Sequence, residues 1–165
     1  MRLFGDMKLH YLTSVSIPAK NAQSVQIMAN AKEFANELKE QFKLVKPGDI
    51  SKGESWEYNI NCVAGKGRLK YLEFSIRQMF LPLEFDDYVY TRDVLIAAIW
   101  CFRGLRTTYE IHQKPSLKAS LLIRWMIGKP NFKIVVISQA LKSFVVGQFG
   151  ISERRILVAH DGVDL

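Results

Sequence analysis

The chain has 165 residues, 48% of them hydrophobic, which is enough for one buried core and about the size of one domain. Lys and Arg outnumber Asp and Glu by 23 to 16, so the formal net charge is +7. The longest clean apolar run, 94–102, is well short of the roughly 18 residues of a bilayer-spanning helix, and Cys62 and Cys101 lack zinc-finger spacing. The sequence therefore excludes a transmembrane helix and a zinc finger, and we expect a reduced cytoplasmic setting.

Strand and helix patterns alternate along the chain. Strands are predicted at 9–15, within 42–49, and at 59–64, 87–90, 106–112, 132–138 and 154–160. Helices are predicted at 25–42, 69–80, 92–102, 116–127 and 139–148, and 50–59 is predicted to be an exposed loop. Strands separated by helices of this length imply right-handed crossovers. The predicted fold class is α/β, a Rossmann-like parallel sheet with helices on both faces.

Residues that follow the strands are the first candidates for a site, because ligands of such sheets bind outside the carboxyl ends of the strands. These candidates are Ser16, Lys20, Asn21, Ser24, Arg92, His112 and Ser138. Asn21 opens a helix whose amides and dipole suit an anion or sugar hydroxyls, or it simply caps that helix. Arg92 is predicted to begin a helix, where a cation opposes the dipole. That position indicates a ligand, although a solvated arginine gives the same pattern, and Ser138 has the position of an N-cap.

Glu110 and His112 share one face of the predicted strand 106–112, because side chains alternate along a strand. A glutamate within reach of the imidazole can fix its tautomer. A histidine at a strand end is also often a satisfied structural residue. From the residues alone, both interpretations of His112 stay open.

Motifs of several other protein classes are absent from the sequence. GKGR at 65–68 lacks the spacing of a P-loop, and no G-x-G-x-x-G follows the first strand. The sequence also has no H-E-x-x-H metal pair and no G-x-S-x-G nucleophile elbow. ATP hydrolysis is therefore not expected. The missing glycine motif argues against a nicotinamide-binding domain, which stays open as an alternative.

Four stretches, taken together, resemble one family. They are SVSIPAKNAQSVQIMANAKEFA (14–35), DDYVYTRDVL (86–95), YEIHQKP (109–115) and ISQALKSFVVGQFGISERRILVAHDGVDL (137–165). Their order resembles the N-terminal domain of a retaining glycosyltransferase of the GT-B fold, family four (glycosyl transferases group 1). The last stretch is the most specific, because a strand, a serine-led helix, an F-G-I break, a strand and H-D-G-V-D-L follow one another as they do in this family.

The resemblance implies a transferase whose active site lies between two Rossmann-like halves, of which this chain is the half that holds the acceptor. His112 would be the catalytic residue, facing the transferring sugar and positioning its hydroxyls without acting as a covalent nucleophile. The implied substrate-binding residues are Ser16, Lys20, Asn21, Ser24, Arg92, Glu110 and Ser138. Asp161 and Gly162 would belong to the crossover loop on the donor side. The donor would be a nucleotide-diphosphate sugar, and no cofactor or metal is implied.

The same resemblance divides the chain into a leader at 1–7, an acceptor-side domain at 8–160 and the start of a crossover at 161–165. The expected partners are the nucleotide-sugar donor, a sugar or lipid-linked acceptor and a C-terminal donor-binding domain that the chain lacks. We expect no catalysis without that domain. The product would be a polysaccharide, a glycolipid or another glycoconjugate.

A basic segment suggests an anionic membrane surface as a further partner. Between Arg103 and Lys133 there are seven basic residues and one acidic residue, Glu110. The predicted helix 116–127 combines two of these cations with leucines and a tryptophan, a composition that suits the inner face of a membrane. The alternative is that its apolar residues pack on the sheet and its cations are merely solvated. The expected location is cytoplasmic, with peripheral membrane contact as an addition to it.

Two other classes compete with the transferase. One is a non-catalytic nucleotide- or sugar-binding Rossmann-like module, or a half-enzyme that needs a partner subunit. The other is a nucleic-acid-binding protein, which we do not expect because the sequence has no recognition helix or RNA-binding aromatic motif.

Overall fold

The computed structural model describes residues 7–17, 22–49, 54–63 and 67–159. Its helices and strands are β1 (Leu9–Leu12), α1 (Ala22–Leu38), β2 (Phe42–Pro47), β3 (Glu57–Ile60), α2 (Gly67–Arg77), β4 (Tyr88–Thr91), α3 (Val94–Phe102), β5 (Arg106–Ile111), α4 (Leu117–Ile127), β6 (Phe132–Val136), α5 (Gln139–Phe149) and β7 (Ile156–Val158). Short 3-10 turns lie at Lys39–Gln41, Gln78–Phe80 and Glu153–Arg155.

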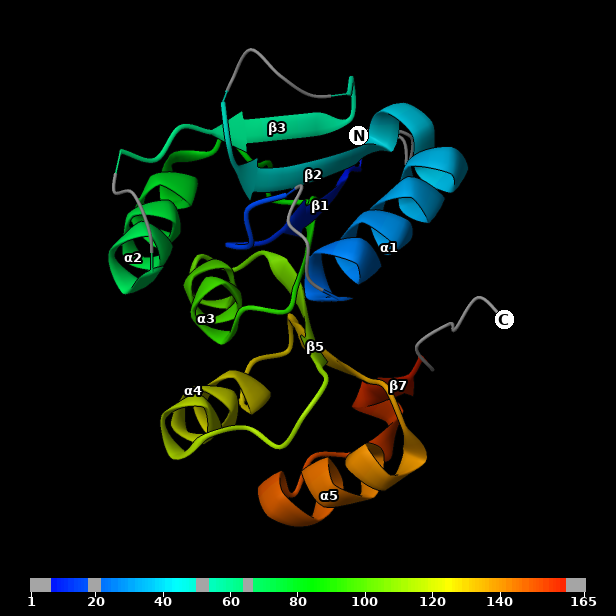
Figure 1. The fold of residues 1–165 in the computed structure, drawn as a ribbon. Coiled ribbons are helices and arrows are strands. Elements are labelled where there is room, and N and C mark those ends of the chain that lie inside the picture. Colours follow the sequence, from blue (N-terminus) through cyan, green and yellow to red (C-terminus); the bar gives the residue numbers. More distant parts are fainter. Residues whose placement is uncertain (1–6, 18–21, 50–53, 64–66, 160–165) are drawn as a thin grey trace. The chain divides into compact units, whose positions relative to one another are not determined.

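The strands form one seven-stranded parallel sheet in the order β3-β2-β1-β4-β5-β6-β7, flanked by helices (Figure 1). This arrangement confirms the predicted α/β class and the Rossmann-like parallel sheet. The chain forms two compact units, Met1–Val89 and Tyr90–Leu165. Strand β4 begins in the first unit and ends in the second.

In the first unit, α1 and α2 lie on opposite sides of β1, β2 and β3 (Figure 1). Phe34 of α1 packs on Tyr11 and Phe42, with ring centroids 6.4 and 5.8 Å away. Cys62, after β3, is a partly exposed free thiol. The buried side chains of α1 are those of Ser24, Ile27 and Ala31. Val25, the first apolar position of the predicted helix, is 66% exposed, so the buried face of this helix differs from the predicted one.

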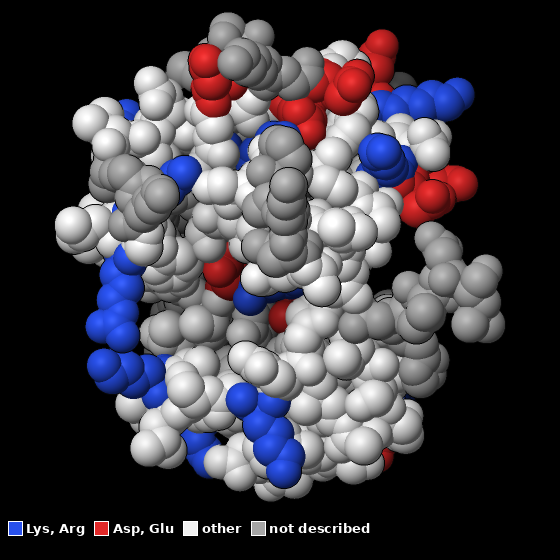
Figure 2. Space-filling view, viewed as in Figure 1, with Lys and Arg blue, Asp and Glu red and all other residues white. Residues whose placement is uncertain are grey.

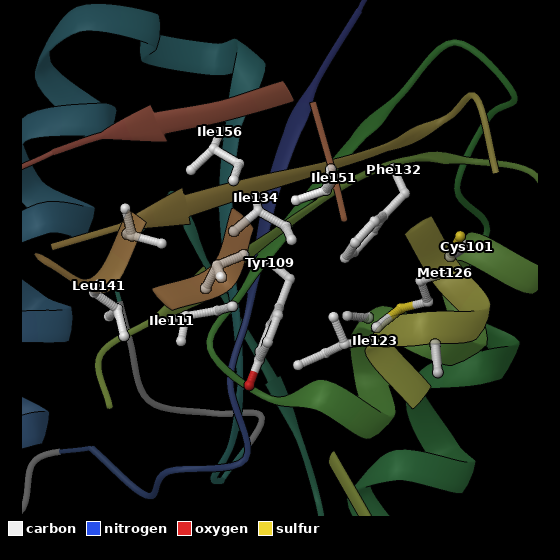
Figure 3. Close-up of a cluster of buried hydrophobic side chains, with 14 residues drawn as sticks. Cys101, Tyr109, Ile111, Ile123, Met126, Phe132, Ile134, Leu141, Ile151 and Ile156 are labelled. Carbon is white, nitrogen blue, oxygen red and sulfur yellow. The ribbon is translucent and has the colours of Figure 1, made fainter. Parts of the chain in front are cut away.

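The core of the second unit lies between one face of β5, β6 and β7 and the helices α3, α4 and α5 (Figure 3). Tyr109, Ile111 and Ile134 alternate along their strands and point into this core, as a parallel sheet covered by crossover helices requires. Cys101 of α3 is buried in it as a free thiol. On the other face of β6, Lys133 is exposed while Val135 is buried, so this face of the strand is only partly covered.

Local signals in the sequence set the ends of the last two helices. Ser116 precedes α4 and accepts a hydrogen bond from the N–H of Ala119 at 3.3 Å. Ser138 does the same before α5, accepting from the N–H of Leu141 at 3.2 Å. Gly150 ends α5 with φ 66°, in the left-handed region where glycine carries no Cβ penalty. The F-G-I break of the sequence, at 149–151, is therefore the end of this helix.

The predicted bounds of the first helix and of the strand after β2 are wrong. Phe42, predicted as the last apolar position of the first helix, is the first residue of β2. Lys39 takes φ 51°, which a right-handed helix cannot continue, so α1 ends at Leu38. The strand predicted at 59–64 lies two residues earlier, at Glu57–Ile60, because it pairs in parallel with Leu44–Pro47 of β2.

Candidate functional site

The candidate site is built around Glu110, which lies near the carboxyl end of β5 and whose side chain is only 4% exposed. Arg92, directly after β4, binds it at two points: Nε donates to Oε2 and Nη2 donates to Oε1, both at 2.9 Å. The hydroxyl of Tyr90 donates to Oε2 at 2.5 Å. His112 completes the set, with Nε2 lying 2.8 Å from Oε1. Four donor groups therefore surround one carboxylate, two at each oxygen.

These contacts fix the charge state of Glu110. Burial by itself would raise the pKa of this carboxyl, but hydrogen bonds from His112, Arg92 and Tyr90, together with the charge of Arg92, lower the pKa to about 2. The three hydrogen bonds from Tyr90 and Arg92 and the contact of His112 Nε2 engage both carboxylate oxygens. Glu110 is therefore an anion that orients its neighbours, and its geometry does not suit it to accept a proton from a substrate.

His112 remains partly accessible in this cluster. Its side chain is 25% exposed, whereas the side chains of Arg92 and Glu110 are each 4% exposed. Because a carboxylate only accepts, the ring nitrogen that faces Glu110 is the one that carries a proton. The predicted proximity of Glu110 and His112 is confirmed, and the arrangement holds the imidazole in one orientation at the end of a strand.

Arg92 does not lie in the first turn of the helix. Helix α3 begins at Val94 with Asp93 as its N-cap, so Arg92 precedes it. Its guanidinium is directed at Glu110. The negative charge of that carboxylate offsets the unfavourable interaction of a cation with the N-terminus of a helix. The unusual position of this cation in the sequence is thus explained by an ion pair.

The remaining predicted residues are distributed more widely. Ser138 follows β6 and caps α5, as described above. In the first unit, Ser16 accepts a hydrogen bond from Lys70 Nζ at 2.8 Å, and Ser24 is buried in α1. Four predicted residues lie outside the described residues: Lys20, Asn21, Asp161 and Gly162.

Tyr90 is the member of the cluster that the sequence analysis missed. It lies two residues before Arg92, and alternation along β4 brings both to the same side as the Glu110 carboxylate. The spacing of two residues between Tyr90 and Arg92 was the signal that could have indicated a shared face. A tyrosine inside an apolar strand is, however, more often a core residue, and nothing local distinguishes the two cases.

A second polar cluster, also missed, lies in the first unit. Lys46 Nζ of β2 donates to Glu57 Oε1 of β3 at 2.6 Å, and each side chain is 6% exposed. The pair lines a pocket of about 830 Å³ together with Met28 of α1 and Trp56. The sequence had placed Glu57 in an exposed loop, and only the register between β2 and β3 brings it to Lys46.

Within the described ranges, no three His, Cys, Asp or Glu side chains gather where they could hold a metal ion. In the same part of the chain, no helix has both the length and the apolar character needed to cross a membrane. No protein-family model and no curated protein matches the chain.

Proposed function

We propose that this chain is the acceptor-side part of a retaining glycosyltransferase, which moves a sugar from a nucleotide-diphosphate donor to an acceptor. The single observation that supports the proposal is His112: a partly exposed imidazole at the carboxyl end of a central strand, held by a buried carboxylate. The carboxyl ends of parallel strands are where such sheets bind ligands. The resemblance of the four sequence stretches supplies the reaction class.

His112 has the chemistry that this role needs. The nitrogen facing Glu110 is occupied, so the opposite edge of the ring is the part that meets a substrate hydroxyl. A hydrogen bond from a fixed imidazole orients the sugar next to the reacting carbon, at little entropic cost because the ring is already immobilised. Glu110, Arg92 and Tyr90 are positioning residues in this scheme, since they act on the substrate only through His112.

The departing nucleotide diphosphate carries most of the charge that develops in the transition state. Its stabilisation is assigned to the C-terminal domain, in keeping with the resemblance. Transfer with retention then requires the acceptor hydroxyl to attack from the face that the diphosphate leaves. No covalent intermediate with this chain is part of the proposal.

The test uses the product of the complete reading frame that encodes this chain. Release of nucleotide diphosphate is measured with a panel of nucleotide sugars and both soluble and lipid-linked acceptors, and the anomeric configuration of the product is read by NMR. His112→Ala is expected to lower kcat on the order of 10²-fold, as removal of one positioned transition-state hydrogen bond does. Gln113→Ala, which changes an exposed neighbour, serves as the matched control and is expected to leave kcat unchanged.

Two outcomes would overturn the proposal. Full activity of His112→Ala, with wild-type stability, would remove the histidine from the reaction. Binding of a nucleotide sugar by calorimetry, with no turnover for any acceptor, would identify a non-catalytic binding module instead.

A further inference from the structure

Helix α4 carries an apolar stripe that faces away from the core. Leu117, Leu121 and Trp125 are spaced four residues apart and therefore share one side of the helix, and they are 87%, 69% and 40% exposed. Phe102, the last residue of α3, is 78% exposed, and its ring centroid lies 6.2 Å from that of Trp125. These four residues, Phe102, Leu117, Leu121 and Trp125, are called the docking face below.

The core of the second unit does not account for this stripe. Ile123 and Met126, on the other side of α4, are fully buried and supply the packing against the sheet. The alternative interpretation, in which the apolar residues of this helix pack on the sheet, therefore does not hold for Leu117, Leu121 and Trp125. Contiguous exposed apolar side chains of this size are typical of a surface that binds a protein, a membrane or a ligand.

The docking face is bordered by cations. Lys118 and Arg124 are exposed on α4, and Arg103, next to Phe102, is exposed as well. The ammonium group of Lys129 lies 5.1 Å from the ring centroid of Trp125. Figure 2 shows Lys and Arg side chains at the lower left, in the region where Figure 1 labels α4.

The sequence that carries this border is poor in acidic residues. Between Arg103 and Lys133 the only acidic residue in the sequence is Glu110. Its side chain is 4% exposed and bound by Arg92 and Tyr90. The segment that carries the docking face is therefore strongly basic, which favours a partner that is anionic as well as apolar.

We propose that the docking face binds the surface of an anionic phospholipid bilayer. The leucines and aromatic rings enter the boundary between headgroups and acyl chains, where tryptophan is favoured, and the bordering Lys and Arg side chains reach the phosphates. The same charge argues against a second copy of the chain as the occupant, because two such faces would repel each other. This inference is independent of the proposed transferase activity.

The experiment measures co-sedimentation of the full chain with large unilamellar vesicles. Vesicles of phosphatidylcholine alone are compared with vesicles containing about 30% phosphatidylglycerol, and binding is expected only to the anionic ones and to weaken with salt. Emission from Trp125 is followed in a Trp56→Phe background, since Trp100 is fully buried. A blue shift and quenching by brominated acyl chains are expected on binding.

Charge and insertion are tested by separate variants. The double variant Lys118→Glu and Lys129→Glu is expected to weaken the partition coefficient by at least about tenfold. Leu121→Gln is expected to weaken it as well and to abolish the quenching. The control variants change exposed residues of the first unit, Arg68→Glu on α2 and Phe80→Gln, which is 82% exposed. Both controls are expected to bind as the wild type does.

Any of three results would overturn the proposal: equal binding to neutral and anionic vesicles, an unchanged partition coefficient in the charge variant, or no binding at all. Sedimentation velocity in the absence of lipid tests whether a second copy of the chain binds the docking face. A dimer that Leu121→Gln dissociates would assign the docking face to self-association instead. Leu121 and Lys118 are exposed and Lys129 is partly exposed. Circular dichroism confirms that each variant is folded before its binding is compared.

Discussion

Arg92 and Glu110 form a two-point ion pair in which each side chain is 4% exposed and both N–O distances are 2.9 Å. Removing one partner leaves the other charged and buried. We therefore expect Glu110→Ala and Arg92→Ala each to lower the free energy of unfolding by about 3 kcal/mol or more. Urea unfolding measures this, with the double variant completing the cycle. The double variant should lose clearly less than the sum of the two single changes, and strict additivity would contradict the pairing.

The stability that Glu110 contributes should depend on pH. Its folded-state pKa is about 2, below the ordinary 4.5, so the unfolded chain binds the proton more readily. The contribution is complete above about pH 4.5 and is lost as the pH falls toward 2, for a total on the order of 3 kcal/mol. The difference in unfolding free energy between the wild type and Glu110→Gln should shrink from pH 6 to pH 3. A difference that stays constant over this range would contradict the low pKa.

His10 should give pH dependence in a higher range. Burial lowers its pKa below 6.5, although the contact of its Nε2 with Asp87 Oδ2 at 3.0 Å acts to raise it; the charges of Lys8 and Lys43 lower it further. Because the unfolded chain takes up this proton more readily, the fold should lose stability as the pH falls below about 6.5. Unfolding free energies at pH 8 and pH 5.5 measure the loss. His10→Asn should reduce it, and an identical loss in that variant would assign the effect to other groups.

Two adjacent arginines should differ sharply in their effect on stability. Arg155 donates from Nη1 to the carbonyl of Ile127 at 2.7 Å and from Nη2 to the carbonyls of Lys129 and Phe132 at 2.5 and 2.8 Å. It thereby binds carbonyls at the end of α4 and at the start of β6. Arg155→Ala should cost about 2 kcal/mol, and Arg155→Lys should recover only part of this because one ammonium cannot reach all three oxygens.

Arg154 provides the control for that comparison. It is exposed, and Arg154→Ala should change the unfolding free energy by no more than about 0.5 kcal/mol. Thermal and urea unfolding of the three variants give the ranking directly. Equal losses at the two positions would show that the guanidinium of Arg155 contributes no more than its charge.

The parts of the fold that the sequence predicted are those that depend on local patterns. The cap at Ser138, the stop at Gly150 and the shared face of Glu110 and His112 follow from neighbouring residues, and all three are present. The contact of Lys46 with Glu57 could not be predicted in this way, since it depends on the register between two strands. Likewise, no residue type signals the left-handed φ of Lys39, which ends α1 before the apolar period does.

The exposure of α4 illustrates a different limit. The sequence shows apolar residues around much of the circumference of this helix but does not indicate which of them the sheet will cover. The packing of the helix on the sheet decides which side chains are covered. Ile123 and Met126 are buried, whereas Leu117 and Leu121 stay exposed. Composition could therefore suggest a membrane-binding helix, whereas the residues of the docking face required the structure.

The chain's two cysteines lie in different units and have different access to solvent. Cys62, in the first unit, is partly exposed, whereas Cys101, in the second, is 2% exposed and its thiol has a pKa raised by burial. An alkylating reagent reaches Cys62 in the folded chain but must wait for the core to open before it reaches Cys101. The rate at which Cys101 is alkylated therefore measures how often the core of the second unit opens, and no added probe is needed for this measurement.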